Sequence, residues 1–271
     1  MKPAELLRKH HLKPKKDWGQ NFLGDERVLG QLAALARLEA GDWCVELGAG
    51  LGHFTQALQA TGARQIVAVE RDRELVPILR DELPGVEIAE ADAKSFDLKA
   101  IAARAGGRIV LCGNLPYHLT SSILFHLLDQ RVAVKRAVFL LQREVAERIA
   151  APPGGRDYGL LSVLVQHVAE VRIGLEVSRH VFTPPPDVES SALVLEMLAE
   201  PRAAVGDEQR FRALVKAAFG LRRKTLWNAL KHFEGGREAL QASGIDPQRR
   251  AETLSVAEFA AVERALPPPA A

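Results

Sequence analysis

The sequence predicts an α/β fold, a doubly wound Rossmann-like sheet followed by a small C-terminal all-α domain. Two observations lead to this prediction. Short apolar runs alternate with helical segments between residues 42 and 141, which is the rhythm of parallel strands joined by crossover helices. From residue 208 onward the apolar residues recur only at helical spacing. We place a basic arm at residues 1–18 and the two domains at residues 19–200 and 207–271.

The composition excludes several classes of protein. No apolar run approaches the ~18 residues of a membrane helix, and the polar, basic N-terminus has no signal-peptide core. We therefore expect a cytoplasmic protein with no membrane partner, and a monomer. The two cysteines, Cys44 and Cys112, each lie within an expected internal strand. We interpret them as core residues, and we expect neither a disulfide nor a metal site.

The segment Asp42–Thr55, DWCVELGAGLGHFT, indicates a buried strand, a glycine-rich turn and the start of a helix. Gly48 and Gly50 in this turn let the backbone approach a ligand closely. The dinucleotide fingerprint would need a glycine at position 53, which His53 occupies, so the pattern argues against NAD. A plain connection between a core strand and a helix is the alternative for this turn alone.

Acidic residues stand near the ends of three predicted strands. Glu46 ends the first, Glu70 closes the second and Asp92 follows the third. Ligands of such sheets bind beyond the C-terminal ends of the strands. Glu70 can accept hydrogen bonds from two ribose hydroxyls, and Asp92 can accept one from the adenine amine, with the small Ala93 leaving room for the ring. The sequence therefore predicts an adenosine-type cofactor, although Asp92 as a helix N-cap is an alternative.

The tetrapeptide Asn114–Tyr117, N-L-P-Y, directly follows another predicted strand. Pro116 fixes its own φ and pushes Leu115 into an extended conformation, which holds backbone carbonyls at a set angle beside Asn114. The Asn114 Oδ1 atom and a neighbouring carbonyl can each accept one hydrogen of an sp² amine. Tyr117 offers a ring on which a base can stack. This combination indicates a binding site for a flipped-out base.

A proline-stiffened loop, Val181–Ser190, lies between the last two predicted strands. We expect it to hold Phe182 rigidly over the pocket, opposite Tyr117. The alternative is that the loop is only a rigid connector.

Basic residues gather at two places in an almost neutral chain. The first cluster includes Lys15 and Lys16 in the N-terminal arm, and the second includes Arg222, Arg223 and Lys224 in the helical domain. Together they indicate a polyanionic partner, with RNA or DNA first.

These motifs, taken together, resemble the rRNA adenine N6-dimethyltransferases, and the bacterial small-subunit KsgA/RsmA enzymes look nearest. The resemblance covers almost the whole chain in collinear order, and only His118 departs from it, where the family often has Asn. The motifs are G-Q-N-F-L (Gly19–Leu23), E-L-G-A-G-L-G (Glu46–Gly52), Glu70, D-A (Asp92 and Ala93), N-L-P-Y (Asn114–Tyr117), V-F-x-P-x-P-x-V-x-S (Val181–Ser190) and F-R-A-L-V-K-A-A-F-G-L-R-R-K-T-L (Phe211–Leu226).

The resemblance implies a class I methyltransferase that uses S-adenosyl-L-methionine. It implies dimethylation of the N6 amines of two adjacent adenines in the 3′-terminal hairpin of 16S rRNA, within an immature small subunit. The cofactor residues expected on this basis are Gln20, Asn21, Leu23, Glu46, Gly48, Gly50, Glu70, Arg71, Asp92, Ala93 and Asn114. The expected catalytic residues are Asn114, Leu115, Pro116, Tyr117 and Phe182, and the expected RNA-binding residues are Lys15, Lys16, Arg222, Arg223 and Lys224.

The N6 lone pair of adenine is delocalised into the ring and is a poor nucleophile. Asn114 Oδ1 and the Leu115 carbonyl would hold the two amine hydrogens and aim the lone pair, so neither a general base of shifted pKa nor a metal is required. Two alternatives stay open. One is a 23S rRNA adenine N6-methyltransferase of the antibiotic-resistance type, and the other is a non-catalytic RNA-binding assembly or transcription factor on the same fold.

Overall fold

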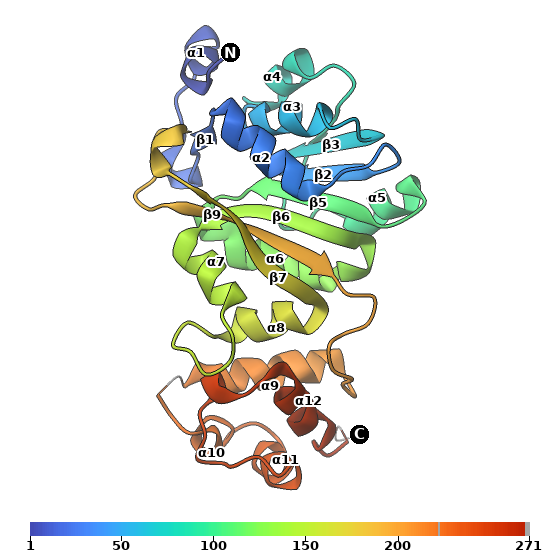
Figure 1. Ribbon diagram of the computed structural model, residues 1–271, viewed down its shortest axis with the longest axis vertical. Helices are drawn as coiled ribbons and strands as arrows, with labels where there is room; N and C mark the ends of the chain where they lie inside the picture. Colours follow the sequence, from blue (N-terminus) through green and yellow to red (C-terminus); the bar gives the residue numbers. More distant parts are fainter. Residues whose placement is uncertain (222, 269–271) are drawn as a thin grey trace. The chain divides into compact units, whose positions relative to one another are not determined.

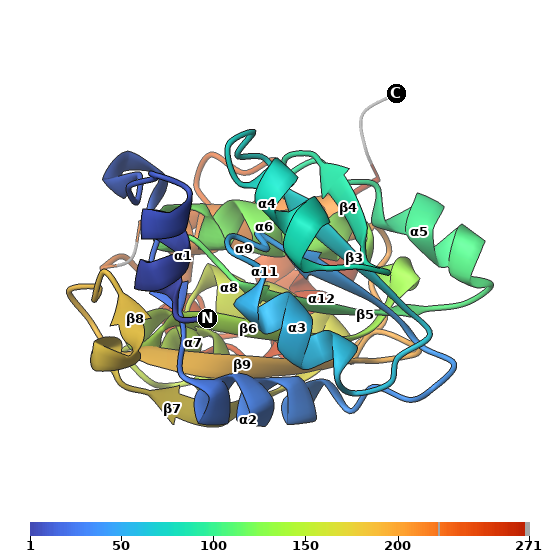
Figure 2. The ribbon, with the colours of Figure 1, turned by 90° about the horizontal axis from the view of Figure 1, so that it is seen from above.

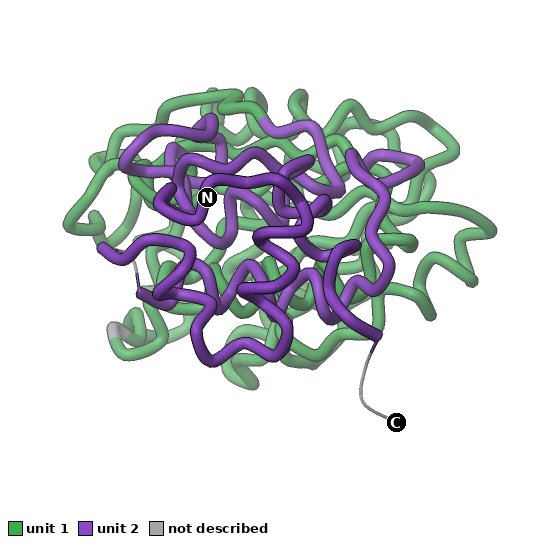
Figure 3. Tube along the Cα trace, turned by 90° about the horizontal axis from the view of Figure 1, so that it is seen from below, with its two compact units in different colours: residues 1–146, 172–197 green, residues 147–171, 198–271 purple. Residues whose placement is uncertain are grey.

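The computed structural model describes residues 1–221 and 223–268, and of Lys16 it describes only the backbone. The chain forms two compact units (Figure 3). Unit 1 comprises Met1–Ala146 and Arg172–Met197, and unit 2 comprises Glu147–Val171 and Leu198–Ala271. No helix among the described residues combines the length and the apolar character that crossing a membrane requires.

A seven-stranded sheet in the order β4-β3-β2-β5-β6-β9-β7 forms the centre of unit 1 (Figure 1). The neighbours from β4 to β6 all pair in parallel, whereas β9 runs antiparallel to β6. The predicted doubly wound α/β sheet is therefore confirmed, with a reversed strand near one edge. The strands are β2 (Trp43–Leu47), β3 (Gln65–Glu70), β4 (Glu87–Glu90), β5 (Ile109–Asn114), β6 (Val134–Gln142), β7 (Ala169–Val177) and β9 (Ser190–Met197).

Helices cover both faces of this sheet. Figure 2 shows α2 (Glu26–Ala36) on one side of β6 and β9 and α6 (Thr120–Asp129) on the other. The Asp25 side chain accepts a hydrogen bond from the Val28 N–H at 3.0 Å and so begins α2. The other unit 1 helices are α1 (Pro3–Lys9), α3 (His53–Gln59), α4 (Val76–Glu82), α5 (Leu98–Ala105) and the start of α7 (Arg143–Ala150).

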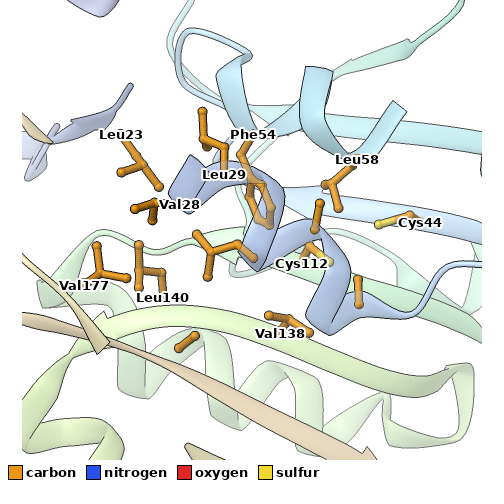
Figure 4. Close-up of a cluster of buried hydrophobic side chains, with 14 of the residues drawn as sticks. Leu23, Val28, Leu29, Cys44, Phe54, Leu58, Cys112, Val138, Leu140 and Val177 are labelled. Carbon is orange, nitrogen blue, oxygen red and sulfur yellow. The ribbon is translucent and has the colours of Figure 1, made fainter. Parts of the chain in front are cut away.

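The core beneath α2 and α3 (Figure 4) joins these helices to six strands of the sheet, β2, β3, β5, β6, β7 and β9. Val28 and Leu29 of α2 pack with Phe54 of α3 in this cluster. Cys44 and Cys112 are buried in the same cluster as free thiols, as expected for core residues. The cluster thus fixes α3, and with it the glycine turn that precedes this helix, against β2 and β5.

A short two-stranded ribbon ties two distant motifs together. β1 (Phe22–Leu23) pairs antiparallel with β8 (Phe182–Thr183), so the G-Q-N-F-L segment lies beside the proline-stiffened loop. Two 3₁₀ turns flank this region, Lys16–Trp18 before β1 and Arg179–Val181 before β8.

The expected basic arm is a folded part of unit 1. Leu6 and Leu7 of α1 are buried in a cluster that includes Phe22. Lys9 pairs with Glu82 at 2.7 Å. Leu6 and Leu7, which stand among charged residues in the sequence, therefore anchor the N-terminal helix to unit 1.

Unit 2 differs from the expected C-terminal domain because it includes residues 147–171. α8 (Leu160–Val168) packs with α9 (Glu208–Gly220), and the rings of His167 and Phe211 lie 4.5 Å apart. The Leu198 N–H also donates to the Val168 carbonyl at 2.9 Å. The predicted domain boundary near residues 200–207 therefore leaves out residues 147–171, which belong to unit 2 although most of them lie between β6 and β7 in the sequence. The other helices of unit 2 are α10 (Leu226–Ala229), α11 (Gly236–Ala242) and α12 (Val256–Arg264).

We predict that Gly113→Ala destabilises unit 1, because β5 approaches β2 closely at this residue. An added Cβ would lie 2.7 Å from the Leu47 carbonyl oxygen and 2.8 Å from Leu115 Cδ2. The expected decrease in the free energy of unfolding is about 1–3 kcal/mol, measured by urea denaturation. Gly107→Ala is the control, because its Cβ would meet no atom within 4 Å. Equal denaturation midpoints for the two variants would contradict this account.

Candidate functional site

A solvent-open cleft lies where the C-terminal ends of β2, β3 and β5 meet the segment before β1. The space inside it, including the open solvent at its mouth, is about 1060 Å³. The structure brings together fourteen of the residues that the sequence analysis assigned to a cofactor or a target base. They are Gln20, Asn21, Leu23, Glu46, Gly48, Gly50, Glu70, Arg71, Asp92, Ala93, Asn114, Leu115, Pro116 and Tyr117.

The glycine turn forms the floor of the cleft. Gly48 and Gly50 have φ values of +77° and +58°, a left-handed conformation that favours glycine. The Gly50 N–H donates to Glu70 Oε2 at 2.8 Å, and the Gly48 N–H donates to the Val69 carbonyl at 2.9 Å. A Cβ on Gly50 would also lie 3.2 Å from the Phe22 ring. The turn is therefore fastened to the end of β3, and a side chain at Gly50 would crowd the Phe22 ring.

Glu70 presents a fixed carboxylate to the cleft. Its Oε1 accepts the Asp72 N–H and its Oε2 accepts the Gly50 N–H, each at 2.8 Å. Burial raises the pKa of Glu70 above its ordinary value, although these N–H groups favour the charged form. Each oxygen keeps a second lone pair. Two neighbouring hydroxyls of a ligand can therefore bind to the two oxygens.

Asp92 carries a charge at the rim of the same cleft. Burial acts to raise its pKa, but the Lys94 N–H and the charges of Lys94 and Arg71 hold that pKa below its ordinary value. Its Oδ1 accepts the Lys94 N–H at 2.9 Å in a tight turn, and Arg71 lies 3.4 Å from its Oδ2. The helix cap of α5 is instead Asp97, which accepts the Ala100 N–H at 2.9 Å. The alternative role of Asp92 as the cap of this helix is thus excluded.

Glu46 is a buried carboxyl group at the base of the cleft. Its exposed fraction is 1%, and the Thr55 hydroxyl donates to its Oε2 at 2.5 Å. Burial raises the pKa of Glu46 to about 8, although the bond from Thr55 favours the charged form. Sequence reasoning missed this partner, because Thr55 lies inside the first turn of α3 and follows no recognisable pattern.

Asn114 is the last residue of β5, so this strand includes the first residue of the tetrapeptide that was predicted to follow it. Its Nδ2 donates to the Asn21 carbonyl at 3.0 Å. Because a carbonyl oxygen can only accept, the NH₂ side of the amide faces Asn21 and Oδ1 is the remaining acceptor. The Leu115 N–H donates to the Leu140 carbonyl at 3.2 Å, which fixes the next peptide.

The two aromatic residues predicted to stack on a base lie in different environments. Tyr117 lines the cleft, and its hydroxyl lies 2.8 Å from Ser190 Oγ. Phe182 has an exposed fraction of 3%, pairs with Leu23 in the β1–β8 ribbon and packs in the core beneath α2. The predicted placement of Phe182 over the pocket is therefore corrected, because the ribbon turns this ring into the core.

Sequence reasoning missed a second aromatic residue of the cleft, Trp18. The guanidinium of Arg71 lies 4.2 Å from the centre of its ring, and Lys15 Nζ lies 5.0 Å from it. Gln20 Nε2 donates to Asp72 Oδ2 at 2.8 Å. These contacts fasten residues 15–23, which we call the strap, across one side of the cleft. Only tertiary contacts identify Trp18, because its neighbours in the sequence give no pattern.

The residues predicted to bind RNA belong to both units. Lys15 is paired with Asp72 at 2.7 Å and with Glu74, and these partners raise its pKa. In unit 2, Arg223 and Lys224 are exposed after α9. The side chain of Lys16 and the whole of Arg222 lie outside the described residues. Among the residues that the structure describes, no three His, Cys, Asp or Glu side chains are grouped to hold a metal ion.

The model of the family described as ribosomal RNA adenine dimethylase matches residues 11–266. The chain belongs to this family. A relative from Anaeromyxobacter dehalogenans, named ribosomal RNA small subunit methyltransferase A, is 56% identical over 97% of each chain. The protein of the same name from Myxococcus xanthus is 51% identical over 98% of this chain and 95% of its own. As members of the family are adenine dimethylases, the chain is an rRNA adenine dimethyltransferase.

Two solved structures share the fold. The 23S rRNA methyltransferase ErmE has a TM-score of 0.68 and 25% identity, and the match covers 91% of this chain and 99% of that one. A dimethyladenosine transferase from Plasmodium falciparum has a TM-score of 0.71 and 21% identity over 89% and 95% of the two chains. The second likeness shows the fold alone.

We predict that Glu46→Gln changes the dependence of stability on pH. The pKa of Glu46 is about 8 in the folded protein, above its ordinary value of 4.5. A carboxyl group whose pKa is raised by folding contributes fully to the free energy of unfolding at pH values below its pKa in the unfolded chain. This contribution is lost as the pH rises towards 8, the pKa in the folded protein. Between pH 5 and pH 8 the wild type should lose at least about 1.4 kcal/mol more unfolding free energy than the variant, which is the value of one pKa unit.

Urea denaturation at pH 5, 6.5 and 8 measures this difference. Parallel pH profiles for the wild type and Glu46→Gln would show that Glu46 is already ionised in the folded protein.

Proposed function

We propose that the chain transfers methyl groups from S-adenosyl-L-methionine to the N6 amines of two adjacent adenines in the 3′-terminal hairpin of 16S rRNA. The substrate is this hairpin within an immature small ribosomal subunit, and the enzyme acts as a cytoplasmic monomer. The names of the relatives at 56% and 51% identity support the small subunit as the target. The single observation that carries the chemistry is the orientation of the Asn114 amide by Asn21.

The side chains at the strand ends suit S-adenosylmethionine on three grounds. Glu70 offers two fixed acceptors for a ribose diol, and Asp92 offers a charged acceptor for the adenine amine. Gly48 and Gly50 let the backbone approach the ligand, without the third glycine of a dinucleotide site. When bound, this donor supplies a methyl group on a positively charged sulfur, an electrophile that needs no metal.

The contribution of this chain to the reaction is to hold the amine. Asn114 Oδ1 and the Leu115 carbonyl each accept one N6 hydrogen, which favours a pyramidal nitrogen and frees its lone pair from the ring. Pro116 restricts Leu115 to an extended conformation, which sets the direction of the Leu115 carbonyl. Tyr117 stacks on the base. After the first transfer N6 releases one proton to solvent and retains one hydrogen, so a single acceptor still orients it for the second transfer.

A 23S rRNA target is the second candidate, and the match to ErmE over 91% of this chain favours it. The two targets are separated by incubating the protein with labelled S-adenosylmethionine and either immature small subunits or 23S rRNA. Mapping of the modified nucleotides should give two adjacent dimethyladenines in 16S rRNA. Label found only in 23S rRNA would favour the second candidate. RNA binding without any label would favour the non-catalytic RNA-binding factor.

We predict that Asn114→Ala lowers the rate of methyl transfer more than about a hundredfold, as expected for the removal of an oriented acceptor. Affinity for the small subunit should change little, because RNA binding depends mainly on basic side chains. Asn228→Ala on α10 is the control, since the amide of Asn228 is exposed and bonds to Thr225 of its own turn at 3.1 Å. Turnover of Asn114→Ala at the wild-type rate would contradict the proposal that Asn114 orients the N6 amine.

We predict that neutralising Arg222, Arg223 and Lys224 together weakens RNA binding and flattens its dependence on salt. For each phosphate that the variant no longer neutralises, the slope of log K against log salt should become shallower by about 0.7–0.9. Exposed Arg80 and Lys99 in unit 1 are the sites of a control variant of similar chemistry. If the slope of log K against log salt were the same for this variant and the wild type, the RNA would bind to other residues.

A further inference from the structure

The hydroxyl of Tyr117 is held by Ser190, a residue to which the reaction so far gives no role. The two hydroxyl oxygens lie 2.8 Å apart and share a hydrogen bond in which either group can donate. Ser190 is the first residue of β9, and its exposed fraction is 0%. The bond therefore joins the base-binding tetrapeptide to a strand 73 residues further along the chain.

Ser190 is a rigid anchor because backbone contacts fix it on both sides. It pairs with Gln142 in the antiparallel ladder between β6 and β9. The Glu189 carbonyl before it accepts the Arg143 N–H at 3.0 Å, and the Glu189 carboxylate accepts the Arg179 N–H at 2.8 Å. The position of the Ser190 backbone, from which its hydroxyl extends, is thus set by the central sheet.

Tyr117 is held less firmly by its own backbone. It begins a single 3₁₀ turn, Tyr117–Leu119, directly after Pro116. A ring attached only through its Cβ can change its χ1 and χ2 angles. A hydrogen bond at the far end of the ring restricts both angles, and a half-buried phenol needs such a partner in any case.

We propose that Ser190 is a positioning residue for methyl transfer. Its hydroxyl sets the tilt of the Tyr117 ring, and the adenine that stacks on this ring thereby presents N6 to Asn114. This role rests on the proposed function, because it requires an adenine in the cleft. It also explains the hydroxyl of Tyr117, since stacking alone needs only the ring.

The next residue, Ser191, provides a matched control. It lies on the same strand, pairs with Leu141 and has an exposed fraction of 1%. Within the described part of the chain, its hydroxyl has no hydrogen-bond partner. Ser191→Ala therefore removes the same atom from an equally buried place without loosening Tyr117.

The first test compares the turnover of Ser190→Ala, Tyr117→Phe, the double variant and Ser191→Ala on immature small subunits. Each of the first two should lower kcat about tenfold, the scale of a small misplacement of a reacting group. The double variant should be no slower than either, because both changes remove one shared bond. The KM for S-adenosylmethionine should not change, and Ser191→Ala should match the wild type.

The second test reads the position of the base without turnover. A hairpin RNA carries 2-aminopurine in place of one target adenine, and stacking on Tyr117 quenches its fluorescence. The fluorescence of 2-aminopurine should be quenched less when the RNA is bound to Ser190→Ala than when it is bound to Ser191→Ala, while the two variants bind the RNA with equal affinity. A merely structural role for Ser190 would not separate the two variants once both are shown to be folded at the assay temperature.

Equal kcat for Ser190→Ala and Ser191→Ala would overturn this role, as would additive effects in the double variant or equal quenching. The proposed function fails in a different way. A wild-type protein that transfers no methyl group to small subunits contradicts the proposed function and this role together, whereas normal turnover of both wild type and Ser190→Ala contradicts only the role of Ser190.

Discussion

The orientation of one side-chain amide determines what the cleft can do. Asn114 lies at the tip of β5, and its NH₂ group is bound by the Asn21 carbonyl of the strap. If the strap were absent, the amide could turn over and present a donor where the reaction needs an acceptor. The sheet sets the position of Asn114, and the strap sets which end of its amide faces the cleft. The proposed catalytic geometry therefore depends on a hydrogen bond between residues 93 positions apart.

The charges around the cleft suit the proposed reaction, which moves a methyl group without a general base. Asp92 remains ionised at the rim through its basic neighbours, whereas the pKa values of Glu46 and Glu70 are raised by burial. Buried acids with raised pKa values are often general acids or bases. Here both carboxylates already accept hydrogen bonds from the fold, Glu46 from Thr55 and Glu70 from two backbone N–H groups. Their arrangement indicates binding and support of the turn instead.

The sequence was sufficient for the sheet and for most of the cleft, because strand ends and glycine turns are local signals that a general rule brings together. It was insufficient wherever a tertiary contact determines the direction of a side chain or the bounds of a unit. The ribbon between β1 and β8 turns Phe182 into the core, and nothing in a proline-rich loop reveals the direction of its aromatic ring. Likewise, the basic residues near Lys15 suggested an RNA contact, whereas Asp72 and Trp18 occupy its ammonium group. Unit 2 includes residues 147–171 because they pack on α9, which no linear boundary shows.

The ribbon between β1 and β8 has a consequence for the order in which the protein is made. The strap is synthesised before the sheet, but Phe22 of the strap pairs with Thr183, which is synthesised much later. A nascent chain therefore cannot form this ribbon until about two thirds of its length has emerged, because contacts of such large sequence separation form late. A product terminated before β8 would keep the contacts of the strap with Arg71 and Asp72 but would lack the ribbon beside the cleft.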